Sequence, residues 1–203
     1  NPLRAIFSFA HFHYEIRTIV AGEIYKMADV PWWYVPFYLS IKTPTLVLAG
    51  AILSMGFLSH AMARGGTGFV SGRRAETAFV AFVAIFPVLC EAVTEGPAFT
   101  GMRHFLFVVP PLAVLAGLGF DEALTALSAR RFVEASATGL LAAAFLYNAS
   151  VLVRLHPYEY LFYNPLVGGL EGAQRRYEMD YWVNMMPDAV QAWFDQAHQA
   201  FLQ

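Results

Sequence analysis

Four long apolar segments constrain the fold of this chain more than any other feature of its sequence. They cover residues 44–58, 76–92, 103–120 and 134–153, and their charge-free stretches hold about 14 to 21 residues. A helix needs roughly 20 apolar residues to cross a bilayer core, and flanking charged side chains can reach the lipid surface from shallow depth. We therefore expect an all-α integral membrane protein with about four transmembrane helices.

The composition supports this class and excludes others. Only 14% of the 203 residues are charged and 58% are hydrophobic, whereas soluble domains carry about 25% charged residues. The net charge of −2 argues against a nucleic-acid partner, which requires a basic face. The single cysteine, Cys90, excludes an intrachain disulfide framework and multi-cysteine metal sites. The expected partner is thus the lipid bilayer.

The chain opens with Asn1-Pro2-Leu3, without an initiator Met, and no signal peptide follows. We expect it to be a piece of a longer protein.

Basic residues predict the orientation of the spans. They gather in the loops after the first and third apolar segments: Arg64, Arg73, Arg74, Arg130 and Arg131. Because loops rich in Lys and Arg stay in the cytoplasm, residues 1–41, 92–102 and 154–203 are expected to face outward.

Residues 31–44 allow two interpretations. In the favoured one, Thr43 is the N-cap and Pro44 the first residue of the first span. Lys42 then lies at the membrane surface, and the segment Pro31 to Ile41 lies in the interface, where Trp and Tyr are enriched. The alternative is one long span from Trp33 that contains Lys42, at a cost of several kcal/mol.

Two spans carry features that predict their packing. The third contains Pro110-Pro111, which we expect to break its hydrogen-bond ladder and kink it. The fourth carries small residues around Gly139 and Ala143. Since small residues let membrane helices approach closely, we expect the fourth span to be buried among other helices.

The chain divides into three parts. Residues 1–41 form an outer loop with an interfacial segment, residues 42–153 the four-helix bundle, and residues 154–203 a small outward-facing tail. Within the tail, apolar residues spaced mostly three or four apart from Pro187 to Phe201 predict an amphipathic helix.

Charged residues at the outer end of the bundle are candidates for function. Arg103, with His104 beside it, could hold a phosphate or could serve only as an interfacial anchor. Glu91 and Glu95 lie one helical turn apart and could bind a cation or act as acid and base. The alternative for this pair is a solvated helix end.

His11 and His13 suggest a metal site only weakly, because residues two apart do not share a helix face and no third ligand is evident. We predict no metal site and no cofactor from these residues, and the requirement for a divalent metal stays open.

The tail is dense in aromatic, amide and carboxylate residues, which suit either a sugar-binding surface or an aromatic membrane belt. The candidates are Tyr158, Glu159, Tyr160, Asn164, Asp180, Tyr181 and Trp182. Both interpretations stay open.

Three stretches together resemble one family. They are PWWYVPFYLSIKTP at 31–44, GMRHFLFVVPPLA at 101–113, and HPYEYLFYN at 156–164 with YEMDYW at 177–182. Their order and spacing are similar to those of bacterial glycosyltransferase family 39-like proteins. These are multi-pass membrane enzymes of the GT-C fold, related to protein mannosyltransferases and to the aminoarabinose transferase of lipid A.

The resemblance implies transfer of a sugar from a polyprenyl-phosphate donor to an acceptor on the outer face of a bacterial inner membrane. In this family an Asp in the first outer loop is the general base. No Asp here matches it, and neither Asp29 nor Asp180 is offered as a substitute. The resemblance implies that Arg103, with His104 and Lys42, binds the donor phosphate. The alternatives are a transporter or flippase-type protein and a structural subunit without a substrate.

Overall fold

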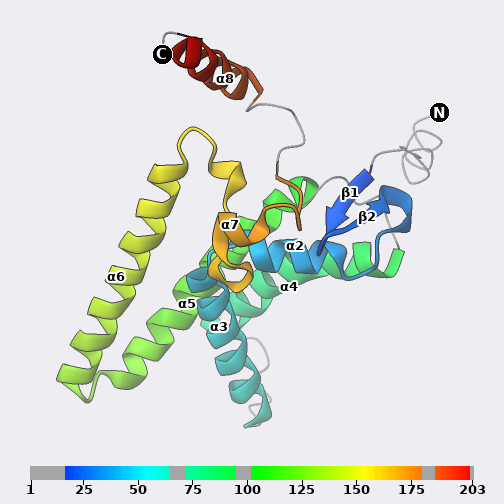
Figure 1. Ribbon diagram of the computed structural model, residues 1–203. Coiled ribbons are helices and arrows are strands. Elements are labelled where there is room, and N and C mark those ends of the chain that lie inside the picture. Colours follow the sequence, from blue (N-terminus) through cyan, green and yellow to red (C-terminus); the bar gives the residue numbers. More distant parts are fainter. Residues whose placement is uncertain (1–16, 65–71, 95–101, 180–185, 202–203) are drawn as a thin grey trace, which may run out of the picture.

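The computed structural model describes residues 17–64, 72–94, 102–179 and 186–201 (Figure 1). All four predicted spans are confirmed as helices. They are α3 (Thr45–Ala63), α4 (Arg73–Thr94), α5 (Val109–Leu127), preceded by the 3-10 helix η2 (Arg103–Val108), and α6 (Arg131–Leu155). Among the described residues these four are long and apolar enough to cross a membrane.

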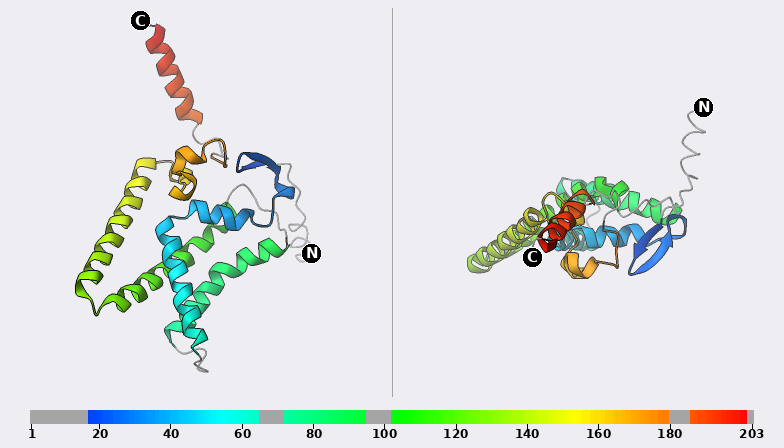
Figure 2. Two further views of the ribbon diagram at one scale, coloured as in Figure 1. Left: turned by 60° about the horizontal axis from the view of Figure 1, so that its bottom comes forward. Right: turned by 45° about the horizontal axis from the view of Figure 1, so that its top comes forward.

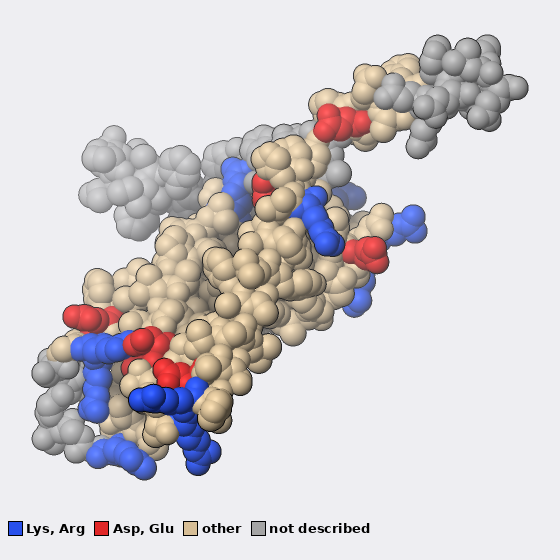
Figure 3. Space-filling model, turned by 90° about the vertical axis from the view of Figure 1, so that its left-hand side faces the viewer, with Lys and Arg blue, Asp and Glu red and all other residues tan. Residues whose placement is uncertain are grey.

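The outside of these helices is apolar. Large hydrophobic side chains such as Phe82 and Leu89 on α4, and Leu140 and Phe145 on α6, are more than half exposed. On the face shown in Figure 3, charged residues gather toward the two ends of the molecule, and a band of uncharged residues lies between them. An exposed apolar belt between charged ends is the surface of a membrane-embedded bundle.

The ends of the helices that carry the arginine-rich loops lie at the same end of the bundle. Helix α3 ends and α4 begins near the bottom of the left view of Figure 2, and the turn between α5 and α6 lies at its lower left. Arg73 at the start of α4 forms an ion pair with Asp121 of α5 there. The structure therefore places the helix ends that flank the two arginine-rich loops on the same side of the bundle, as predicted. That this side is cytoplasmic stays a prediction.

Helices α3 and α5 cross at glycines. A Cβ added to Gly119 would lie 2.1 Å from the carbonyl oxygen of Gly50 and 2.6 Å from the amide nitrogen of Ser54. A Cβ added to Gly50 would lie 2.7 Å from Ala116. The two backbones are thus in direct contact, which is how small residues hold membrane helices together.

The expected burial of the fourth span is wrong. No residue of α6 is buried within the structure as described, and a Cβ at Gly139 would meet no atom within 4 Å. Helix α6 diverges from α3 and α4 in both Figures 1 and 2. The small residues lie where the described part of the chain supplies no neighbour, so close packing does not follow from them.

Two predicted helix features also need correction. Thr43 is the C-cap of α2 (Tyr34–Lys42), and Pro44 is the N-cap of α3. The proline holds Thr43 in an extended conformation (ψ 137°), which ends α2. The single long span from Trp33 is therefore wrong, and Lys42 is the last residue of α2.

The pair Pro110-Pro111 does not break a span. Both prolines lie in the first turn of α5, where backbone N–H groups have no intrahelical acceptor. The geometry changes from 3-10 to α helix just before them, at the end of η2.

A small hairpin precedes α2 and was not expected in an all-α protein. Strands β1 (Arg17–Val20) and β2 (Glu23–Lys26) pair antiparallel, with Val20 opposite Glu23. Positive φ angles at Ala21 (53°) and Gly22 (89°) form the two-residue turn. The short helix η1 (Met27–Asp29) follows.

The tail folds back onto α2. It contains η3 (Glu159–Leu161), η4 (Pro165–Val167), α7 (Gly169–Ala173) and α8 (Met186–Phe201). We call the hairpin, α2 and residues 156–179 together the cap; it lies at the end of the bundle opposite the arginine-rich loops (Figure 1). Helix α8 confirms the predicted amphipathic helix, and its Asp188 accepts a hydrogen bond from Tyr158.

Asn164 joins α2 to the tail. Its side chain is fully buried, and Nδ2 donates to the carbonyl oxygens of Ser40 (2.6 Å) and Thr43 (2.8 Å). The Asn164 backbone N–H donates to the carbonyl of Ile41 at 2.9 Å. One residue thereby satisfies three of the carbonyls that the end of α2 leaves without helical partners.

We predict that Gly119→Ala lowers the free energy of unfolding by about 1–3 kcal/mol, because its methyl group must push α3 and α5 apart. Gly117→Ala on the same helix is the control, since its Cβ would meet nothing within 4 Å. Unfolding in mixed detergent micelles, followed by circular dichroism, measures both. Equal stability of the two variants would contradict the close crossing.

Candidate functional site

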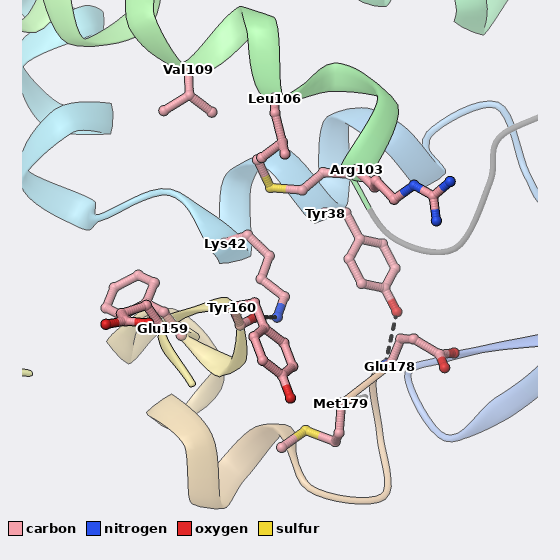
Figure 4. Close-up of a pocket in the computed structure, with 11 residues that line it drawn as sticks. Tyr38, Lys42, Arg103, Leu106, Val109, Glu159, Tyr160, Glu178 and Met179 are labelled. Atoms are coloured by element: carbon pink, nitrogen blue, oxygen red, sulfur yellow. Dashed lines mark hydrogen bonds between the residues drawn. The ribbon is translucent and has the colours of Figure 1, made fainter. Parts of the chain in front are cut away.

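A cavity of about 260 Å³ lies where the cap meets the first turns of the third span. It is lined from α2, from η2 and the start of α5, and from the tail (Figure 4). The lining residues are Tyr38, Lys42, Met102, Arg103, Leu106, Val109, Glu159, Tyr160, Phe162, Glu178 and Met179. The cavity thus combines an apolar wall with two cations and two carboxylates.

Lys42 is the cation of the cavity with the best-defined surroundings. It is half-buried at the C-terminal end of α2, where the helix dipole favours positive charge. Its Nζ donates to the carbonyl oxygen of Tyr160 at 2.8 Å and lies 3.7 Å from the centroid of the Tyr163 ring. An ammonium group has three N–H donors, so Lys42 can hold this carbonyl and a ligand oxygen together.

Burial lowers the pKa of Lys42 to about 8, and the negative charge of Glu178 opposes that shift. The side chain is therefore mostly protonated at pH 7 but titrates far more readily than an exposed lysine. A ligand anion beside it would favour the charged form.

Arg103 enters the cavity from the first residue of η2 and is half-buried. In Figure 4 its guanidinium projects past Tyr38, away from the Lys42 ammonium. Both residues, 61 positions apart in the sequence, line the same cavity, although their charged groups point in different directions. His104 is exposed and does not line the cavity.

Glu178 was not among the residues selected from the sequence, although it belongs to the YEMDYW stretch. It lines the cavity from the tail, and its backbone N–H donates to the Tyr38 hydroxyl at 3.1 Å. Tyr38 and Tyr163 are buried, and burial raises the pKa of both phenols. Both hydroxyls therefore stay protonated and act as donors.

The tail residues predicted to form a sugar-binding surface do not all lie at the cavity. Glu159 and Tyr160 line the cavity. Glu159 also pairs with His156 at 2.6 Å, and this contact lowers the pKa of the Glu159 carboxyl. Tyr158 instead bonds to Asp188 of α8. Asp180, Tyr181 and Trp182 lie outside the described residues.

Asn164 is not a sugar-binding residue in this arrangement. It lies outside the cavity lining, and both of its amide hydrogens are donated to backbone carbonyls of residues 40 and 43. Its amide stabilises the cap, so the expectation of a surface role is corrected.

The remaining candidates do not converge with the cavity. One carboxylate oxygen of Glu91 on α4 is buried with no hydrogen-bond partner among the described atoms. Its proposed partner Glu95, together with His11 and His13, lies outside the described residues. Among the described residues no group of three or more His, Cys, Asp or Glu side chains is placed to hold a metal ion.

Comparisons with protein-family models, with curated proteins and with solved structures gave no match. The chemistry of the cavity is therefore the main guide to function.

We predict that the Lys42 ammonium titrates near pH 8 in the folded protein. Lys26 is the only other lysine and is exposed. Reductive methylation with ¹³C-formaldehyde labels both side chains, and Lys42→Arg and Lys26→Arg assign their NMR signals. A Lys42 midpoint close to the roughly 10.4 of an unperturbed lysine would contradict the burial described here.

Proposed function

We propose that this chain is part of a membrane glycosyltransferase that uses a polyprenyl-phosphate-linked sugar, and that the cavity binds the phosphate end of this donor. The observation that carries the proposal is that Lys42 and Arg103 line one cavity with an apolar wall at one end of the bundle. Leu106 and Val109 of that wall belong to the candidate third span, so the wall continues into the apolar belt.

The shape of the cavity suits a lipid head group. Its 260 Å³ lies just under the roughly 300–1,000 Å³ typical of small-molecule sites, so it fits a head group and not a whole polyprenyl chain. The chain would lie along the exposed apolar surface of the helices. Lys42 and Arg103 supply charge-assisted hydrogen bonds to a phosphate.

The assignment of the reaction rests on the resemblance of three sequence stretches to family 39-like enzymes. Under this proposal the protein resides in a bacterial inner membrane, with the cap facing the periplasm. The acceptor is not assigned. The general base is not assigned to any residue of this chain, so the proposal gives the chain the role of donor binding.

We predict that Lys42→Met and Arg103→Met each weaken binding of undecaprenyl phosphate at least tenfold at pH 7, because a hydrogen bond to a charged group contributes about 1.5–3 kcal/mol. Lys26→Met and Arg154→Met are the matched controls, since neither residue lines the cavity. Binding is measured by microscale thermophoresis in nanodiscs made of zwitterionic lipid.

The reaction is tested with the complete protein in membranes, by release of undecaprenyl phosphate from a labelled sugar-phosphate donor. Arg103→Ala is expected to reduce both donor affinity and turnover. If Arg103→Ala leaves both unchanged, the cavity is not the donor site.

A transporter or flippase is the second candidate, and one observation favours it. Glu91 is an ionisable residue within α4, and such residues inside spans are common in transport pathways. Lipid movement between leaflets that continues without sugar release, and that stops with Glu91→Gln, would favour this alternative. If the chain is instead a structural subunit, variants of the cavity residues should affect folding but neither donor binding nor turnover.

A further inference from the structure

Glu178 is held more firmly than any other carboxylate of the cavity. It lies beside Tyr38, and in Figure 4 its carboxylate projects to the same side of Tyr38 as the Arg103 guanidinium. The other cavity carboxylate, Glu159, is exposed and pairs with an exposed histidine. The two acidic residues therefore differ in how far their positions are determined by the fold.

Three side chains from different elements fix the three polar groups of Glu178. The Tyr38 hydroxyl of α2 accepts the Glu178 backbone N–H at 3.1 Å. The Tyr163 hydroxyl of the tail donates to the Glu178 carbonyl at 2.5 Å. The Thr18 hydroxyl of β1 donates to carboxylate oxygen Oε2 at 3.3 Å.

The partners of Glu178 are themselves held in place. Thr18 is buried and shares a hydrogen bond of 3.1 Å with the buried Tyr34 hydroxyl. Tyr38 donates to the carbonyl of Ile19 at 2.8 Å. The backbone of Glu178 is thus fixed by α2 and the tail, and its carboxylate is contacted from the hairpin by Thr18. This is the arrangement expected of a preorganised binding group.

A carboxylate at this position complements a ligand that carries hydroxyls next to a phosphate. It has about four lone-pair sites, so it can accept the Thr18 hydroxyl and ligand hydroxyls at once. Lys42 and Arg103, on the same cavity, attract the phosphate. Acceptors for hydroxyls and donors for phosphate are therefore present within one site.

We propose that Glu178 is a specificity-determining residue that accepts hydrogen bonds from the sugar hydroxyls of the ligand whose phosphate lies at Lys42 and Arg103. This inference rests on the proposed function and adds the residue that distinguishes a sugar-bearing lipid phosphate from the bare lipid phosphate. Thr18 is a positioning residue for Glu178, because it contacts the carboxylate from the buried side.

A merely structural role for Glu178 makes a different prediction. If Glu178 served only as a counter-ion for Lys42, its removal would disfavour the charged ammonium and weaken every phosphate ligand equally. If it binds hydroxyls, its removal weakens only the ligands that carry a sugar. At a pH well below 8, where the Lys42 ammonium stays charged, loss of a nearby negative charge leaves the affinity for the bare phosphate unchanged or raises it.

The experiment compares two probes on the intact protein in zwitterionic nanodiscs. The probes are undecaprenyl phosphate and undecaprenyl phosphate carrying one hexose, tested with glucose and with mannose. The variants are Glu178→Gln, Thr18→Val and the control Glu171→Gln, an exposed glutamate of α7 outside the cavity lining. Circular dichroism and thermal unfolding check that each variant is folded.

The expected result is that the wild type binds a hexose-bearing lipid more tightly than the bare phosphate. Glu178→Gln should weaken the hexose-bearing lipid about tenfold, the effect of one hydrogen bond to a charged group, and should leave the bare phosphate within about twofold. Thr18→Val should reduce the same discrimination by a smaller factor, and Glu171→Gln should change neither affinity.

Two other results overturn the inference, and they can be told apart. In the first, the wild type binds the bare phosphate, but Glu178→Gln weakens the binding of both probes equally or of neither. Glu178 then does not bind the sugar, and the proposed phosphate site is unaffected. If the wild type binds neither probe, the proposed function itself is wrong. A Glu178→Gln variant that fails to fold is replaced by Glu178→Asp, which keeps the charge and should lose discrimination because its carboxylate is one methylene shorter.

Discussion

The attachment of the tail to the end of α2 is the interaction on which the rest of the cap depends. Helix α2 ends at Lys42 because Pro44 holds Thr43 extended, and this leaves backbone carbonyls without helical partners in a region with little access to water. Asn164 satisfies three of them from a position more than 120 residues later. An unsatisfied buried carbonyl costs about 1–3 kcal/mol, so the tail stabilises the helix end that carries Lys42.

The cavity is a consequence of that attachment. Docking the tail on α2 brings Tyr160 and Glu178 to the side of Lys42, and the start of the third span contributes Arg103. The Tyr38 hydroxyl then connects the tail to the hairpin, because it accepts the Glu178 backbone N–H and donates to the carbonyl of Ile19. The polar side of the site is therefore built from three distant parts of the chain, whereas its apolar side belongs to the membrane belt.

The predictions that succeeded and those that failed differ in the range of the interaction involved. Apolar runs predicted the four spans, and spacing predicted α8, because both depend on neighbours within the same segment. The burial of α6 was predicted wrongly from small residues around Gly139, because packing needs a partner helix at that face. The close crossing at Gly50 and Gly119 could not be predicted, since nothing in the local sequence distinguishes these glycines from the unpacked Gly117.

Local patterns in the sequence were enough to predict four apolar helices with arginine-rich connections on one side, and to select Lys42, Arg103, Glu159 and Tyr160 as candidates. The folded chain was needed to show that these four share one cavity, that Asn164 stabilises the cap, and that Glu178 belongs to the site. Hydropathy is a property of one segment, so the spans can be predicted from nearby residues. The position of a charge in a cavity depends instead on hydrogen bonds between segments, such as Thr18 with Glu178, which are 160 residues apart.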